Sequence, residues 1–221
     1  MLAVANENRP IVAERLGFDV AEFRKGFLED IPVDEASVDC CTSNCVINLS
    51  PDKELVLNGI WRVLKDHGRA VISDIVADRE VPPHQKVDGR LWGECLSGAL
   101  SEDAFLSMLR RAGFHGVEVL RRAPWQTVED VTYLTVTVRA WKFEKKAGCV
   151  FVGQQATYLG PFEAVVDEEG HRFPRGVPIE VCTDTAAKLE APPYHSSFVV
   201  SDATRPFPTV ENGCVPGEAC C

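Results

Sequence analysis

A strand, a helix and a second strand follow one another within residues 37–76, and this run constrains the fold more than any other feature of the chain. Residues 37–49 have the apolar character of a buried strand that ends in a polar turn, and residues 69–76 form the next apolar strand. Strand–helix–strand is the unit from which doubly wound α/β sheets are built. The run therefore predicts an α/β domain.

The helix between these strands carries start and stop signals. Ser50 suits the N-cap, Pro51 the first turn, and Asp52 the positive end of the helix dipole, while Gly68 is expected to end the helix. Apolar residues recur at i, i+4, i+7 and i+8, which gives the helix one buried face. They are Val56, Ile60, Val63 and Leu64.

Further elements extend the alternation on both sides. Upstream, residues 2–16 have a helical composition with Gly17 as a stop, and residues 20–27 suit a short strand. Downstream, Ser101 is expected to cap a helix that Gly113 ends. Two final strands follow at residues 117–120 and 133–141.

Two stretches depart from the alternation. Residues 77–100 contain two prolines and three glycines, so we expect an inserted, partly helical segment. Residues 144–148 are typical of a linker, and residues 147–221 combine short apolar runs with many turn residues. The prediction is an α/β domain over residues 1–146 and a small β-rich domain over residues 147–221.

Charge and hydropathy exclude several classes of partner. The formal net charge of −10 argues against binding to nucleic acid or to an anionic membrane, since both require a basic surface. No apolar run approaches the ~18 residues of a membrane span, and the N-terminus has no basic segment followed by an apolar one. A cytoplasmic protein is the expectation.

Nine cysteines stand out against this ordinary composition. An odd number in a chain without secretion signals does not indicate a disulfide framework. There is no C-x-x-C pair and no histidine at zinc-finger spacing, so we expect no structural metal site. Reduced thiols would then be core residues or parts of a site for a soft, thiophilic element. They are Cys40, Cys41, Cys45, Cys95, Cys149, Cys182, Cys214, Cys220 and Cys221.

Two of these cysteines lie in distinctive surroundings. Cys45, within residues 43–53, follows a strand at the edge where open α/β sheets bind ligands. Cys95 lies beside Trp92 and between glycines, within residues 91–100, which leaves its thiol approachable. Either cysteine alone could be a small core hydrophobe, which is the interpretation kept for Cys40 and Cys41.

Together, residues 43–53 and 93–100 closely resemble the arsenite methyltransferase family, and the resemblance extends over the whole chain. It implies the second half of a Rossmann-like class I methyltransferase sheet that closes on an antiparallel hairpin. It also implies that Cys45, at the strand end, and Cys95, in the insert, are the family's second and third arsenic-binding cysteines. As(III) is soft, and thiolate is the protein ligand that matches it.

The resemblance also implies the reaction. Thiolates hold arsenic with its lone pair towards the methyl group of S-adenosylmethionine, so the protein mainly positions and desolvates the reactants. No general base is needed at arsenic, and we assign no catalytic residue. His67, His84, His115, His171 and His195 are expected to be surface or turn residues. The dipole of the helix after Cys45 would favour its thiolate, whereas Asp39 and Glu94 would oppose it.

The methyl-donor site is only partly represented. No two of the sixteen glycines are separated by a single residue, so the G-x-G turn that cradles such a cofactor is missing. The resemblance puts Leu28 against adenine, Glu29 or Asp30 near its amino group, and Asn44 in the donor site. We therefore expect these 221 residues to be a fragment that lacks most of the donor site.

The chain's terminal thiols and its function leave alternatives open. Cys220 and Cys221 could bind arsenic or assist its reduction, with glutathione or thioredoxin as the thiol reductant, or could be incidental. Cys149, Cys182 and Cys214 are expected to be incidental. The leading function is methyl transfer to arsenite. The alternatives are an arsenic-sequestering protein without catalysis and a methyltransferase for another small molecule.

Overall fold

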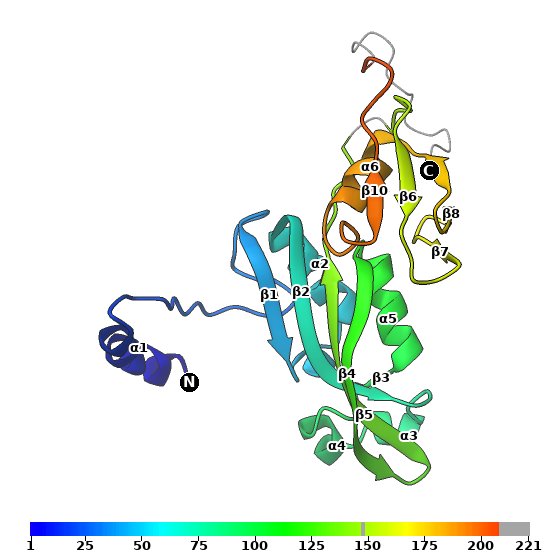
Figure 1. Ribbon diagram of the computed structural model, residues 1–221. Coiled ribbons are helices and arrows are strands. Elements are labelled where there is room, and N and C mark those ends of the chain that lie inside the picture. The colour runs from blue at the N-terminus through cyan, green and yellow to red at the C-terminus, as the bar shows by residue number, and fades with distance from the viewer. Residues whose placement is uncertain (147–148, 208–221) are drawn as a thin grey trace.

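The computed structural model describes residues 1–146 and 149–207, and its centre is a mixed sheet with the strand order β1-β2-β5-β4 (Figure 1). β1 and β2 run parallel, β2 and β5 run antiparallel, and β4 and β5 form an antiparallel hairpin. A short strand, β3, adds to the end of β2. The bounds are β1 Val38–Asn44, β2 Leu64–Ala77, β3 Leu100–Ser101, β4 His115–Val128 and β5 Val131–Trp141.

The main core lies between this sheet and two helices, α2 (Lys53–Val63) and α5 (Glu102–Arg111). The apolar face predicted for α2 is buried, and Phe105 and Leu109 of α5 join the same cluster. Ser101 caps α5 as predicted, because its hydroxyl accepts a hydrogen bond from the backbone N–H of Ala104 at 3.3 Å. Helix–strand alternation and the closing hairpin confirm the predicted fold class.

The N-terminal part packs little. Helix α1 (Leu2–Leu16) ends at Gly17 as predicted, with φ 81°, but none of its residues is buried and it lies apart from the sheet (Figure 1). The strand predicted at residues 20–27 is wrong, since only an isolated bridge between Phe27 and Asp30 forms there. A strand needs a partner, and among the described residues β1 pairs only with β2.

Three further predictions around α2 are corrected. β1 is a half-exposed edge strand and not a buried one, so Cys40 is exposed and Cys41 only partly buried. Asp52 is the N-cap of α2 in place of Ser50, because its carboxylate accepts from Leu55 N at 2.9 Å. The helix ends at Val63, five residues before Gly68, because Leu64 pairs with Val38 of β1 and begins β2.

The segment between β2 and β3 is the partly helical insert that was predicted. It contains two short helices, α3 (Pro83–Lys86) and α4 (Gly89–Gly93). A second apolar cluster joins it to the tip of the β4–β5 hairpin. The buried Gln85 side chain accepts a hydrogen bond from Tyr133 Oη at 2.8 Å, and Ser97 Oγ donates to Gln85 O at 2.7 Å. These hydrogen bonds and this cluster fix the insert to the tip of the β4–β5 hairpin.

Beyond residue 148 the chain forms a small β-rich unit. Its strands are short, and one helix that the sequence did not predict, α6, covers them. Glu168 joins this unit to the sheet, since its carboxylate accepts from Gly116 N at 2.7 Å and Tyr194 Oη at 2.6 Å. The elements are β6 Gln155–Tyr158, β7 Ala164–Val166, β8 Arg172–Pro174, β9 Pro178–Glu180, α6 Thr183–Glu190 and β10 Phe198–Val200.

No helix within the described ranges is long and apolar enough to cross a membrane. The division of the chain at residues 146 and 147 stays a prediction.

Candidate functional site

Cys45 lies directly after β1, where the chain turns away from the sheet. Its backbone N–H donates to Ser73 O of β2 at 2.9 Å, which holds the turn against the neighbouring strand. The side chain is exposed, and its Sγ lies 3.5 Å from Asn44 Oδ1 as a hydrogen-bond donor. The backbone has φ 53°, in the left-handed region that few residues other than glycine adopt.

Cys95 follows α4 in the insert and reaches the same place. Its Sγ donates to the backbone carbonyl of Cys45 at 3.3 Å, so residues fifty positions apart meet at the edge of the sheet. Cys95 also has a positive φ, 62°, and only 8% of the residue is exposed. The two cysteines singled out in the sequence therefore lie together, one on the surface and one beneath it.

A buried carboxylate of β2 organises the loop after Cys45. Asp74 accepts hydrogen bonds from the backbone N–H groups of Ile47 at 3.0 Å and Asn48 at 3.4 Å, at the start of the 3₁₀ turn η1 (Ile47–Leu49). It also accepts from Ile75 N at 2.8 Å. Three backbone donors satisfy the carboxylate, and the loop is fixed to β2. An aspartate in an apolar strand was the only sequence signal for this role.

Asn48 connects the same loop to the insert. Its side-chain amide donates to Ile75 O at 2.7 Å and to Cys95 O at 3.1 Å, and only 5% of the residue is exposed. Gly98 lies against the backbone of Asn48, because a Cβ at Gly98 would stand 2.0 Å from Asn48 O. The insert therefore approaches the loop as closely as a backbone without a side chain allows.

Burial raises the pKa of the Cys45 thiol and of the Cys95 thiol, and the negative charge of Asp74 raises both further. The carboxylate that opposes thiolate formation is therefore Asp74. Asp39 is paired with Lys65, and Glu94 accepts from Gln126.

The residues expected to contact the methyl donor lie near this edge but are not gathered into a closed site. Leu28 is half-buried against the main core, and Asp30 is exposed. The Glu29 carboxylate accepts a short hydrogen bond from Ser50 Oγ, which ties residues 28–30 to the start of α2. Asn44 ends β1 next to Cys45. An apolar side chain beside an exposed carboxylate is suited to an adenine ring. The assignment of these four residues to the methyl donor remains a prediction.

Of the histidines, His115 departs from expectation. It is 6% exposed, and its ring lies between those of Phe143 and Tyr194, with centroids 5.9 and 5.8 Å away. The residue is buried because the C-terminal unit packs against the start of β4 at this point. Burial lowers the pKa of the imidazole. His115 lies at the junction between the sheet and the C-terminal unit, and we assign it no role at the two cysteines.

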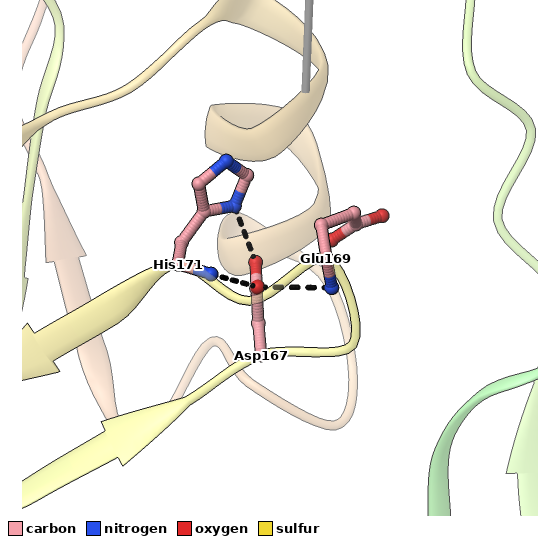
Figure 2. A group of neighbouring side chains, drawn as sticks. All are labelled: Asp167, Glu169 and His171. Carbon is pink, nitrogen blue, oxygen red and sulfur yellow. Dashed lines mark hydrogen bonds and ion pairs between the residues drawn. The ribbon is translucent and has the colours of Figure 1, made fainter.

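Asp167, Glu169 and His171 form a cluster with the spacing of a metal site, between β7 and β8 (Figure 2). Asp167 accepts from the backbone N–H groups of Glu169 and His171 and from His171 Nδ1. The buried Lys188 ammonium already stands 3.0 Å from Asp167 Oδ2 and forms a short ion pair with Glu169. A lysine in this position supplies the positive charge, so the cluster is an ion-pair network.

Two further thiols lie in the C-terminal unit. Cys182 is the buried N-cap of α6, and Cys149 is half-buried. Cys214, Cys220 and Cys221 lie outside the described residues.

The chain is similar to known methyltransferases. A family model described as a methyltransferase domain matches residues 1–113, and a domain of unknown function, DUF8838, matches residues 145–219. The arsenite methyltransferase of Aquipseudomonas alcaligenes is 34% identical over 98% of this chain and 67% of its own length. The human arsenite methyltransferase is 28% identical over 91% of this chain and 57% of its own.

A solved structure is also similar. The crystal structure of an arsenic(III) S-adenosylmethionine methyltransferase from Chlamydomonas reinhardtii has a TM-score of 0.63 and 29% identity, covering 92% of this chain and 74% of that one. Fold and domain match define the class as a methyltransferase-type domain with a Rossmann-like sheet. Within that class, the chain belongs to the arsenite methyltransferase family. It spans only about two thirds of the bacterial relative and just over half of the human one.

Proposed function

We propose that this chain binds trivalent arsenic through Cys45 and Cys95 and presents it for methylation by S-adenosylmethionine. The observation that carries the proposal is the contact of Cys95 Sγ with the carbonyl of Cys45 at 3.3 Å, since it brings two thiol-bearing segments from distant parts of the sequence together. Trivalent arsenic is thiophilic, and paired thiols are the side chains that suit it.

Capture of arsenite by the two thiols balances without an added reagent. At each cysteine an S–As bond forms, an As–O bond breaks, and the thiol proton leaves with the hydroxide as water. S-adenosylmethionine, when bound, would supply an electrophilic methyl group. The arsenic lone pair would form the As–C bond as the sulfonium S–CH3 bond breaks, S-adenosylhomocysteine would leave, and As(III) would become As(V). The protein's part is to fix arsenic with that lone pair exposed and to exclude water.

Arsenite titration followed by calorimetry tests the arsenic site. Linked capture by two ligands exceeds single capture by about 10²–10⁴-fold, so Cys45→Ser or Cys95→Ser should weaken binding by at least about a hundredfold. Cys40→Ser is the matched control, because Cys40 is an exposed thiol on β1, the strand that leads to Cys45. If the double variant Cys45→Ser/Cys95→Ser binds arsenite as tightly as the parent, the site lies elsewhere.

Removal of residues 215–221 tests the terminal pair Cys220–Cys221 separately. We propose that this pair is dispensable for capture. After transfer it reduces As(V) to As(III) and becomes a disulfide, which glutathione or thioredoxin reduces back to the dithiol. Arsenite affinity should then survive the deletion. Complete loss of binding would make the tail the main ligand.

Methyl transfer needs the donor as well as arsenic. Because no G-x-G turn is present in these 221 residues, we propose that this polypeptide alone binds S-adenosylmethionine weakly and transfers little methyl to arsenite. Radiolabelled methyl transfer and donor calorimetry give the test. Micromolar donor binding by the purified polypeptide would contradict the proposal, whereas arsenic binding without transfer would fit a sequestering role.

A further inference from the structure

We infer that Asn48 is a positioning residue that sets the distance between the two arsenic-binding thiols, an inference that rests on the proposed function. Asn48 lies three residues after Cys45 in the same loop, and its side-chain amide donates to the carbonyl of Cys95 at 3.1 Å. The two segments also meet through Cys95 Sγ, which donates to the carbonyl of Cys45 at 3.3 Å. The amide is a second direct connection between the segments that carry the two thiols.

Both hydrogens of the amide are used, which makes the connection rigid. The second hydrogen is donated to Ile75 O of β2 at 2.7 Å, so Asn48 connects the insert to the central strand of the sheet. The backbone N–H of Asn48 donates to Asp74, the next residue back along β2. One hydrogen of the side-chain amide and the backbone N–H thus fix Asn48 to β2. The other amide hydrogen fixes Cys95 to Asn48.

The surroundings leave Asn48 no alternative arrangement. The residue is 5% exposed, so water does not compete for these bonds. Gly98 packs directly onto its carbonyl, which closes the insert over it from the other side. Cys95 is held in a left-handed conformation that an unrestrained cysteine avoids, and the amide bond to its carbonyl is one of the contacts that maintain it.

The amide does not approach a thiol itself. Its two acceptors are backbone carbonyls, and the contact between the two cysteines is made by Cys95 Sγ and Cys45 O. Asn48 therefore acts on arsenic only through Cys95, and this predicts a specific pattern of energetic coupling. Its removal should matter only when the Cys95 thiol is present to be positioned.

A double-mutant cycle tests that coupling. Phenylarsine oxide is the probe, because its trivalent arsenic has two exchangeable positions and so measures a pair of thiols. The full chain carrying Cys220→Ser and Cys221→Ser serves as the parent for every measurement. Asn48→Ala should weaken probe binding about tenfold, as expected for a lost hydrogen bond at a buried site, and should add nothing in a Cys95→Ser background.

Asn58→Ala is the matched control, since Asn58 is an exposed asparagine on α2. It should leave affinity unchanged in both backgrounds. Equal losses from Asn48→Ala with and without the Cys95 thiol would indicate a merely structural role and overturn the inference, as would no loss in either background.

Hydrogen exchange decides the positioning claim independently of arsenic. In Asn48→Ala, the amides of residues 91–99 should exchange at least about tenfold faster, while those of the β4–β5 hairpin away from the insert stay protected. Unchanged exchange in residues 91–99 would overturn the inference. Failure of the parent to bind phenylarsine oxide, with faster exchange in the variant, would instead count against the proposed function alone.

Discussion

At the scale of single residues, the two thiols occupy backbone conformations that their own side chains disfavour. Cys45 has φ 53° and Cys95 φ 62°, and a residue with a Cβ pays about 1–2 kcal/mol for the left-handed region. Bonds from elsewhere in the fold hold both in place, among them Cys45 N to Ser73 O and the Asn48 amide to Cys95 O. Such strain is commonly stored where function requires a fixed side chain.

This strain predicts an unusual order of stability at position 45. Cys45→Gly should be more stable than Cys45→Ala by up to about 1 kcal/mol, because glycine tolerates a positive φ. At exposed Cys40 within β1 the order should reverse, since glycine costs about 0.5–1 kcal/mol in a strand. Urea unfolding of the four variants makes the comparison. Alanine and glycine of equal stability at position 45 would show that the conformation is unstrained.

The raised pKa values of both thiols predict how capture depends on pH. Burial and the Asp74 charge keep the pKa of Cys45 and Cys95 above the ordinary 9.0. Attack on arsenic requires the thiolate, whose fraction grows about tenfold per pH unit below the pKa. Stopped-flow capture of phenylarsine oxide should therefore accelerate about tenfold per unit from pH 6 to 8. A plateau below pH 8 would mean that one thiol is activated.

At the scale of elements, local signals predicted what local chemistry controls. The Ser101 cap, the Gly17 stop and the buried face of α2 appear where the sequence placed them. The strand at residues 20–27 failed because strand formation depends on a partner. The sequence did not predict helix α6, because its eight residues lie among turn-forming segments.

The same distinction applies to the candidate site. Cys45 and Cys95 were identifiable from two motifs, and the structure brings these residues together. The roles of Asp74 and Asn48 were not, because their contacts join residues up to 47 positions apart. Periodicity and capping patterns describe only neighbours along the chain, so such tertiary hydrogen bonds are invisible to them.

The insert's close approach to the loop predicts the effect of one methyl group. Gly98→Ala places a Cβ 2.0 Å from Asn48 O, so the insert must shift, at a cost of about 1–3 kcal/mol. Arsenite affinity should fall as Cys95 moves with it. Gly93→Ala is the control, because nothing lies within 4 Å of the new Cβ there. If calorimetry finds the same arsenite affinity in both variants, the insert accommodates the added methyl group without moving Cys95.

The C-terminal unit depends on its buried charges. Burial alone would raise the pKa of Asp167, but the hydrogen bond from His171 and the charge of Lys188 together lower it to about 2. A lowered carboxyl pKa contributes stability that is fully present above the unfolded value, 3.8, and is lost as pH falls towards 2. Hydrogen exchange should therefore show residues 155–200 opening within that acid range.

Removing the central cation tests the network directly. Lys188 is 2% exposed, so Lys188→Met removes the buried ammonium from three carboxylates, Asp167, Glu168 and Glu169, and should cost about 3–5 kcal/mol. Lys145→Met is the control, since that lysine is half-exposed and 3.5 Å from Glu169. Its loss should cost at most about 1 kcal/mol. Equal effects on the exchange of residues 155–200 would contradict a buried network.

At the scale of the whole molecule, packing is uneven. The sheet, the insert and the C-terminal unit bury continuous clusters, whereas α1 buries nothing and Phe18, Phe23 and Phe27 are exposed. These loosely packed residues lie on the β1 side of the sheet (Figure 1). Cys95 belongs to the second of these clusters and contacts Cys45, so the proposed arsenic site is anchored in the well-packed part.

X-ray absorption at the arsenic edge tests that site most directly, because it counts the sulfur atoms bonded to arsenic. In the protein lacking residues 215–221 and loaded with one equivalent of arsenite, we expect two protein sulfurs, from Cys45 and Cys95. Either Cys45→Ser or Cys95→Ser should reduce the count by one, while Cys40→Ser leaves it unchanged. Arsenic surrounded by oxygen alone, or an unchanged sulfur count in Cys95→Ser, would contradict the account.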